Sequence, residues 1–179
     1  DPMLRSNGFS LARKVLETHF GEQWHNAPYN DRQSWGEVLL TPSKIFHRLL
    51  LETLLGDFNS PRLFPIHGIA HITGGGVPGN LCRILPTGCG ANLKNLHTPH
   101  PAVAQLQTLG SLDEAECYRT WHCGTAMMLV CETADSQAIC ATLNQADTDV
   151  EAQVVGTITD NPVITIDSKF SGKSLSFPL

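Results

Sequence analysis

Apolar side chains recur along the chain in two ways, at helical spacing in some stretches and as short continuous runs in others. Recurrence every three or four residues predicts an amphipathic helix, and a short apolar run between turn residues predicts a buried strand. The helical patterns lie in the stretch that follows Ser6-Asn7-Gly8, at 44–55, and roughly at 100–109, 112–121 and 135–145. The strand patterns lie at 67–72, 88–93 and 124–132, and near 151–159 and 162–167.

Boundary signals support some of these elements. Thr41-Pro42-Ser43 precedes the helix expected at 44–55, and Pro is tolerated near a helix start. Gly56 follows it, and Gly commonly ends helices. Residues 21–35 contain Asn, Pro and Asp and are expected to form a loop.

The order of the elements predicts the fold class. Adjacent strands alternate with strands that are separated by helices, which indicates an α+β fold, a layered sandwich of a mixed sheet and helices, and excludes a doubly wound Rossmann array. With 179 residues, the chain is expected to form one domain over 1–179.

Composition narrows the classes of function. Hydrophobic residues make up 41% and charged residues 16%, which predicts a folded globule and excludes a disordered chain. The net charge of −5 argues against a surface that attracts nucleic acid as a whole, so any phosphate is expected to bind locally. We expect no membrane partner either, since no stretch approaches the roughly 18 apolar residues of a membrane span.

The cysteines and the N-terminus bear on location. The 6 cysteines show no Cys-x-x-Cys spacing, so we expect no zinc site, and reduced thiols in apolar runs indicate a cytoplasmic protein. The chain begins at Asp1 without an initiator methionine and without a signal pattern, and we interpret it as a piece of a longer protein.

The run Thr73-Gly74-Gly75-Gly76 lies between an expected strand and a helix that begins near Pro78 or Gly79. Glycines let backbone N–H groups approach an anion, which predicts a phosphate site, although a plain tight turn explains the run equally well. The run lacks the Lys-Ser/Thr pair of a P-loop. His71, Asn80 and Arg83 flank it and favour the phosphate interpretation.

Two further sets of residues have both a structural and a chemical interpretation. His67 and His71 are separated by an even number of positions on one strand, so both side chains are expected on one face. We expect a structural role for His67; His71 borders the glycines, and general acid or base work and a structural role both stay open for it. Ser6-Asn7-Gly8, taken alone, is a capping and turn segment.

In the second half, Arg119 has the geometry of a phosphate ligand or of a salt-bridge partner for Asp113 or Glu116. His97 and His100 lie beside prolines, in what is expected to be an exposed loop, and we assign them no chemistry.

Several of these motifs, taken together and in this order, resemble the C-terminal domain of aminoimidazole ribonucleotide synthetase, the phosphoribosylformylglycinamidine cyclo-ligase family. The resemblance extends from about Ser6 to about Ile158. The motifs that carry it are SNGFSLARKVL, LLTPSKIF, HGIAHITGGGVPGNLCRILP, ECYRTWHCGTAMMLV and VVGTI.

The resemblance implies an enzyme of purine synthesis that uses ATP to close formylglycinamidine ribonucleotide to aminoimidazole ribonucleotide. It implies a homodimer in which an N-terminal domain, absent from this chain, makes most contacts with ATP and Mg²⁺. The piece itself is then expected to be inactive. In this chain the resemblance assigns catalysis to His71 and Asn7, and it assigns binding of substrate and its phosphate to Ser6, Gly8, Thr73, Gly74, Gly75, Gly76, Asn80 and Arg83.

The chain departs from the family pattern at three places. Gly79 stands where Glu is usual, Trp121-His122 where Phe-Asn is usual, and Ala126 where Gly is usual. These changes are interpreted as variation between lineages, with a diverged paralogue as the alternative. Two other functions stay open, a related ATP-dependent enzyme similar to formylglycinamidine ribonucleotide synthetase and a non-catalytic module for ligand binding or subunit contact.

Overall fold

The computed structural model describes residue 4, residues 7–56 and residues 61–179. The fold is mixed α+β, which confirms the predicted class. One sheet is the antiparallel pair β1 (Ile66–His71) and β3 (Met127–Cys131). The other has the order β4-β2-β5-β6, formed by β4 (Gly156–Thr159), β2 (Gly90–Leu93), β5 (Val163–Asp167) and β6 (Ser174–Pro178). It is a mixed sheet, because β2 and β5 are parallel while the outer pairs are antiparallel.

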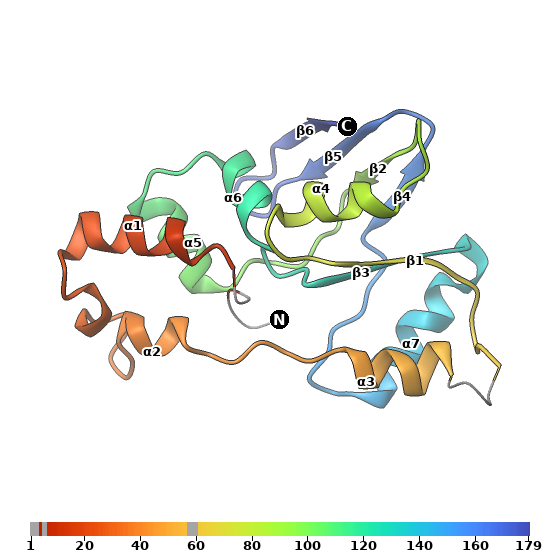
Figure 1. Ribbon diagram of the computed structural model, residues 1–179, viewed down its shortest axis with the longest axis horizontal. Helices are drawn as coiled ribbons and strands as arrows, with labels where there is room; N and C mark the ends of the chain where they lie inside the picture. Colours follow the sequence, from red (N-terminus) through yellow and green to blue (C-terminus); the bar gives the residue numbers. More distant parts are fainter. Residues whose placement is uncertain (1–3, 5–6, 57–60) are drawn as a thin grey trace.

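The helices lie on both sides of the β1–β3 pair (Figure 1). The α-helices are α1 (Phe9–Phe20), α2 (Trp35–Leu39), α3 (His47–Leu50), α4 (Gly76–Leu81), α5 (Pro101–Leu109), α6 (Glu114–Thr120) and α7 (Ser136–Ala146). Short 3₁₀ turns occupy Trp24–Asn26, Cys82–Ile84 and Thr133–Asp135, and a π-helical turn, η2, spans Leu51–Leu55. No helix in the described ranges combines the length and the apolar character that crossing a bilayer requires.

The β1–β3 pair separates two hydrophobic cores. Successive side chains of a strand point to opposite faces, so Met128 and Val130 of β3 belong to the larger core, whereas Met127, Leu129 and Cys131 belong to the smaller one. The larger core lies among α1, α2, α4, α5, α6 and the four-stranded sheet. The smaller core is formed with α3, η2 and α7. Both faces of the pair are therefore covered.

The prediction of one helix over 44–55 was wrong in its first part. Residues 41–46 are not helical, α3 begins at His47, and the chain then widens into η2. The apolar periodicity misled because Ile45 is 73% exposed and contacts no core, whereas Leu50 and Leu54 pack beside α7. A helix forms only where its apolar face is buried.

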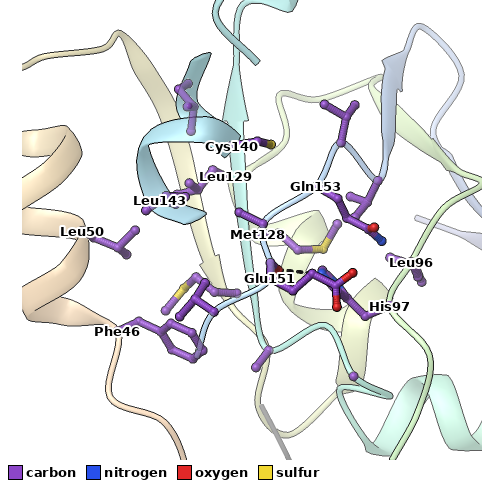
Figure 2. Close-up of a pocket in the computed structure, with 18 of the residues that line it drawn as sticks. Phe46, Leu50, Leu96, His97, Met128, Leu129, Cys140, Leu143, Glu151 and Gln153 are labelled. Atoms are coloured by element: carbon purple, nitrogen blue, oxygen red, sulfur yellow. Dashed lines mark hydrogen bonds between the residues drawn. The ribbon is translucent and has the colours of Figure 1, made fainter. Parts of the chain in front are cut away.

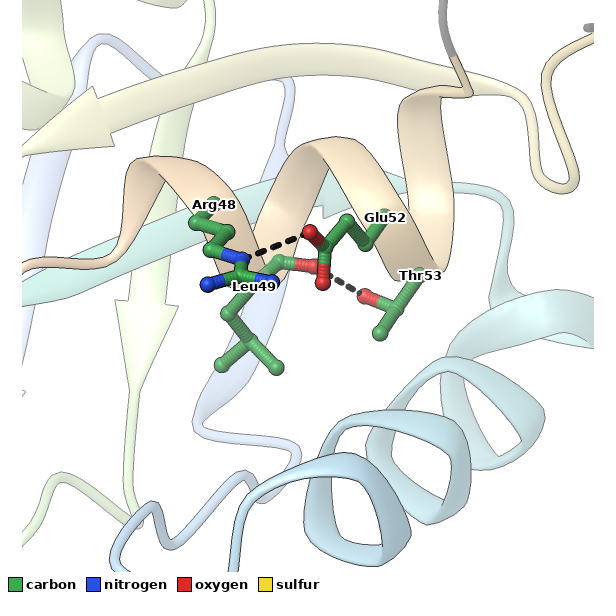
Figure 3. A network of polar contacts seen from close by, with 4 residues as sticks. All are labelled: Arg48, Leu49, Glu52 and Thr53. Carbon is green, nitrogen blue, oxygen red and sulfur yellow. Dashed lines mark hydrogen bonds and ion pairs between the residues drawn. The ribbon is translucent and has the colours of Figure 1, made fainter.

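Side-chain bonds span the junction between α3 and η2 (Figure 3). Arg48 Nε lies 2.6 Å from Glu52 Oε1, and the Thr53 hydroxyl donates to the Leu49 carbonyl at 2.6 Å. The ion pair is exposed, so it contributes little to the free energy of unfolding.

Other boundaries also differ from the prediction. Helix α4 begins at Gly76 and not near Pro78 or Gly79, and β2 begins at Gly90 and not at residue 88. Helix α2 was not predicted and begins at the last residue of the predicted loop, where Ser34 and Glu37 form a capping box. Strand β6 was not predicted. Strand β3 begins later than expected because Cys123 and Gly124 form a turn with positive φ. Strand β4 begins at Gly156, since Asn144 binds both backbone groups of Ala152 and holds that segment outside the sheet.

Candidate functional site

The glycine turn, Thr73–Gly76, joins β1 to α4. Its last two residues, Gly75 and Gly76, have φ of +96° and +58°, in the region that disfavours any side chain. Gly76 has a second constraint, because a Cβ atom there would lie 1.8 Å from the carbonyl oxygen of Tyr118. The backbone of α4 therefore lies directly against the backbone of α6, and only glycine permits this contact.

The side chain of Asn80 binds the backbone carbonyl groups of the glycine turn. Its side chain is 4% exposed, and its Nδ2 donates to the carbonyl oxygens of Thr73, Gly74 and Gly76 at 3.3, 3.2 and 2.7 Å. The Thr73 hydroxyl donates to Asn80 Oδ1 at 3.4 Å. With three carbonyl groups turned toward one amide, the turn directs its oxygens inward.

The N–H groups of the turn are used differently from one another. The Gly76 amide donates to the Thr73 carbonyl at 3.0 Å. Within the described part of the chain, the amides of Gly74 and Gly75 donate to no acceptor, and both residues are exposed. These two amides are the donors that the turn offers to an anion, as backbone nests do.

The segment before α1 lies beside the glycine turn. The Trp121 indole Nε1 donates to the Gly8 carbonyl at 3.1 Å, and a Cβ atom on Gly8 would lie 2.4 Å from Trp121 Cδ1. Asn7 Nδ2 is 3.9 Å from the position of a Cβ atom on Gly74. Asn7 Oδ1 is buried and has no hydrogen-bond partner among the residues that the structure describes. Ser6, also predicted for this site, lies outside the described residues.

The structure thus places Asn7 and Asn80 against the glycine turn, with Gly8 next to Asn7 along the chain. It places His71 at the end of the strand that leads into the turn, and Arg83 away from the turn. His71 is exposed at the end of β1, opposite Met127 of β3. Arg83 is exposed in the 3₁₀ turn after α4, at the end of this helical segment that is remote from the glycines. The catalytic assignments of His71 and Asn7 stay predictions.

Neighbouring polar residues have clear structural contacts. His67 Nε2 lies 3.0 Å from Glu132 Oε1, a pair that joins the ends of β1 and β3. Arg119 lies over the ring of Phe177 at 5.0 Å, an interaction that neither interpretation of its sequence position anticipated. His122, where the family usually has Asn, is 4% exposed and accepts the Gly124 N–H at Nδ1 over 3.0 Å.

A second feature is a cavity of about 1540 Å³ between α3, β3, α7 and residues 149–158 (Figure 2). Its wall combines apolar side chains, among them Phe46, Leu129 and Leu143, with polar and charged ones. At its rim, Lys44 Nζ lies 2.7 Å from Asp147 Oδ2. No local pattern in the sequence indicates this cavity, because its walls come from segments that are distant along the chain.

His97 and His100 are half-buried, so the expectation that they lie in an exposed loop was wrong. His97 Nε2 donates to the Glu151 carbonyl at 2.8 Å, and its Nδ1 is 3.0 Å from the Thr125 hydroxyl. Its ring therefore connects Glu151, in the segment 149–158, with Thr125 in the loop that follows α6.

Comparison with known proteins places these motifs in a family. Residues 3–169 match the family model described as "AIR synthase related protein, C-terminal domain". Strand β6 lies beyond the matched residues.

Three curated relatives illustrate the likeness, and each is named phosphoribosylformylglycinamidine cyclo-ligase. That of Geotalea uraniireducens is 42% identical over 127 residues, 70% of this chain and 34% of the relative. That of Sorangium cellulosum is 43% identical over 130 residues, 72% of this chain and 36% of the relative. That of Syntrophotalea carbinolica is 36% identical over 156 residues, 87% of this chain and 42% of the relative. The chain thus spans between a third and somewhat over two fifths of the length of these relatives.

Proposed function

Because the chain belongs to the AIR synthase related protein family as a C-terminal domain, we propose that it is the C-terminal part of a phosphoribosylformylglycinamidine cyclo-ligase. In this proposal the whole enzyme uses ATP to close formylglycinamidine ribonucleotide to aminoimidazole ribonucleotide, in the cytoplasm, as a step of purine synthesis. The observation that carries it is the identity of 42% with a relative of that name over 70% of this chain.

We propose that residues 1–179 form one domain that supplies part of the substrate site. The Gly74 and Gly75 amides bind the substrate phosphate, since they are exposed donors in a turn whose carbonyl groups Asn80 already satisfies. Asn7 Nδ2, which lies beside Gly74, donates to the same ligand. The amides achieve this in a chain of net charge −5, where no overall positive field attracts a phosphate.

We assign ATP and Mg²⁺ mainly to the N-terminal domain of the whole enzyme, which also forms the homodimer. Among the described residues of this chain, no three His, Cys, Asp or Glu side chains converge where they could hold a metal ion. In this proposal the part of this chain is to bind and orient the substrate.

The phosphate site is tested by ¹⁵N NMR of the 179-residue chain titrated with inorganic phosphate and then with formylglycinamidine ribonucleotide. The Gly74 and Gly75 amide signals should shift, and the nucleotide should act at the lower concentration. The amide of Gly88, an exposed glycine elsewhere with φ of +88°, is the internal control and should stay unmoved. Unmoved Gly74 and Gly75 signals would contradict the site.

The variant Asn80→Asp tests the inward orientation of the turn. It replaces an amide donor with a carboxylate that faces three carbonyl oxygens, so it should abolish the phosphate response of the glycine amides. An Asn80→Asp protein that still binds phosphate with wild-type affinity would show that the turn does not depend on this side chain.

The reaction itself is tested in a longer enzyme. We expect the isolated chain to release no ADP with ATP and formylglycinamidine ribonucleotide, and ADP release would contradict the assignment of ATP to the missing domain. In a hybrid, this chain replaces the C-terminal part of the Geotalea uraniireducens cyclo-ligase and should restore formation of aminoimidazole ribonucleotide. A folded hybrid that binds the substrate but does not close the ring would refute the cyclo-ligase proposal.

A further inference from the structure

Two histidines in neighbouring loops accept backbone N–H groups through Nδ1. His100 accepts the Ala102 N–H at 3.1 Å and so caps the N-terminus of α5. His122 accepts the Gly124 N–H at 3.0 Å and so closes the turn between α6 and β3. A ring nitrogen that accepts a hydrogen bond carries no proton, so both imidazoles are neutral at Nδ1 in this structure. Protonation would turn Nδ1 into an N–H donor that faces the backbone N–H of Ala102 or Gly124, so the hydrogen bond would be lost.

The loops that contain these rings are packed together. A Cβ atom on Gly124 would lie 2.4 Å from the carbonyl oxygen of Thr98, so the two backbones are in direct contact. The Thr125 hydroxyl accepts the backbone N–H of His97 at 3.1 Å and lies 3.0 Å from its Nδ1. A change in either loop therefore reaches the other through backbone contacts.

The second loop also reaches the segment before α1. Trp121 immediately precedes His122, is 1% exposed, and donates its indole N–H to the Gly8 carbonyl at 3.1 Å. Gly8 follows Asn7, whose side chain lies beside Gly74 of the glycine turn. The Trp121 indole is thus the link between the histidine loops and the glycine turn.

Three carboxylates near the second loop accept hydrogen bonds from other groups. Glu114 accepts from Ser168 and Ser171, Glu116 from Thr120, and Asp113 from the Ala115 N–H. Within the described residues, no carboxylate pairs with His100. Titratable and charged groups lie on every side of the two loops. The cavity that His97 and His100 line also contains Lys44, Asp147, Asp149, Glu151 and Lys169. Helix α1, which contacts α5, carries Arg13, Lys14, Glu17 and His19, and the α6 region carries Asp113, Glu114, Glu116, Cys117, Tyr118, Arg119 and Cys123.

Burial acts in the same direction as the geometry. Desolvation lowers the pKa of His100 below the ordinary histidine value. When the pKa is lower in the folded than in the unfolded state, the unfolded state takes up the proton first as pH falls. The contribution of His100 is therefore complete above about pH 6.5, the pKa of an unfolded histidine, and declines below it.

We propose that His100 and His122 form an acid-sensitive clamp that holds Trp121 and Gly8 against the glycine turn at neutral pH and releases them when the imidazoles are protonated. The inference rests on hydrogen bonds in this chain and does not depend on the reaction proposed above. Its effect is to connect proton uptake in two loops with the geometry of the candidate phosphate site.

The test uses ¹⁵N NMR of the wild-type chain between pH 7.5 and pH 5.5, with the Trp121 indole N–H signal as the reporter. We expect this signal to shift or broaden with a midpoint below about pH 6.5. The double variant His100→Asn, His122→Asn replaces each ring nitrogen by an amide oxygen that accepts the same N–H and does not titrate. Its indole signal should keep the neutral position down to pH 5.5.

The variant His47→Asn removes an exposed histidine on α3 and is the matched control, which should respond like the wild type. An acid response that is equal in the double variant and the wild type would overturn the proposal, as would a wild-type indole signal that does not move. Long-range ¹H–¹⁵N spectra of the wild-type imidazoles at pH 7.5 provide a measurement that needs no variant. They should show Nδ1 without a proton in His100 and His122, and a protonated Nδ1 in either ring would also overturn the clamp.

Discussion

Replacing Gly76 with alanine tests whether the backbone contact between α4 and α6 fixes the glycine turn. The added Cβ would lie 1.8 Å from the Tyr118 carbonyl oxygen and 2.8 Å from the Arg119 carbonyl carbon. Real Cβ contacts do not occur at such distances, and the obstructing atoms belong to backbone, so no side chain can rotate away. Either α4 moves from α6 or the turn changes its conformation.

Two costs add in the Gly76→Ala variant. Alanine at a φ of +58° costs about 1 kcal/mol or more, because its Cβ approaches the following carbonyl oxygen. Forcing an extra methyl group into a packed contact costs typically about 1–3 kcal/mol. We therefore expect the free energy of unfolding to fall by about 3 kcal/mol. With a urea m-value of roughly 2 kcal/mol/M, the unfolding midpoint should fall by about 1.5 M.

Gly79 provides the matched control in the same helix. A Cβ atom there would meet nothing within 4 Å, and alanine favours the helix over glycine, so Gly79→Ala should raise the free energy of unfolding by about 0.5–1 kcal/mol. Urea unfolding followed by circular dichroism measures both variants. If Gly76→Ala unfolds within about 0.5 kcal/mol of the wild type, the close contact between α4 and α6 does not exist as described.

Two further predictions concern glycine and cysteine positions. Gly8 and Gly21 share a φ of +77°, but only a Cβ atom on Gly8 would collide, at 2.4 Å from Trp121. Gly8→Ala should therefore lower the thermal midpoint of unfolding by several degrees more than Gly21→Ala does. Equal shifts would contradict the Trp121 contact. Burial raises the pKa of the Cys117 thiol to about 12 and that of the Cys123 thiol well above its usual value. At pH 8, mass spectrometry should therefore find both thiols unalkylated by iodoacetamide until urea unfolds the protein. Rapid labelling in the folded protein would refute their burial.

The sequence was most informative where a residue type has few conformations available. Three consecutive glycines after an apolar run predicted the end of β1, the turn and the start of a helix, and the structure has all three in that order. The helix at 135–145 was predicted to within one residue of α7 because its periodic face is buried in the smaller core. Local chemistry and tertiary packing agree at these places.

Prediction failed where the tertiary context decided. The apolar spacing at 44–55 is helical, yet Ile45 finds no core to pack against and residues 41–46 stay extended or irregular. The capping box of Ser34 and Glu37 was visible in the sequence and would have located α2. The cavity walls and the contacts of His97 depend on segments far apart in the chain, which no local pattern can place together.

The glycine turn shows what separates a motif from a site. Residue types indicated that amides at 74–76 were available, but they did not indicate which of the N–H groups the turn itself would use. The structure assigns the Gly76 amide to the Thr73 carbonyl and turns three carbonyl groups toward Asn80, so two exposed amides remain. Because those donors are uncharged, recognition of an anion there depends on the rigidity of the turn, which rests on Asn80 and on the backbone contact at Gly76.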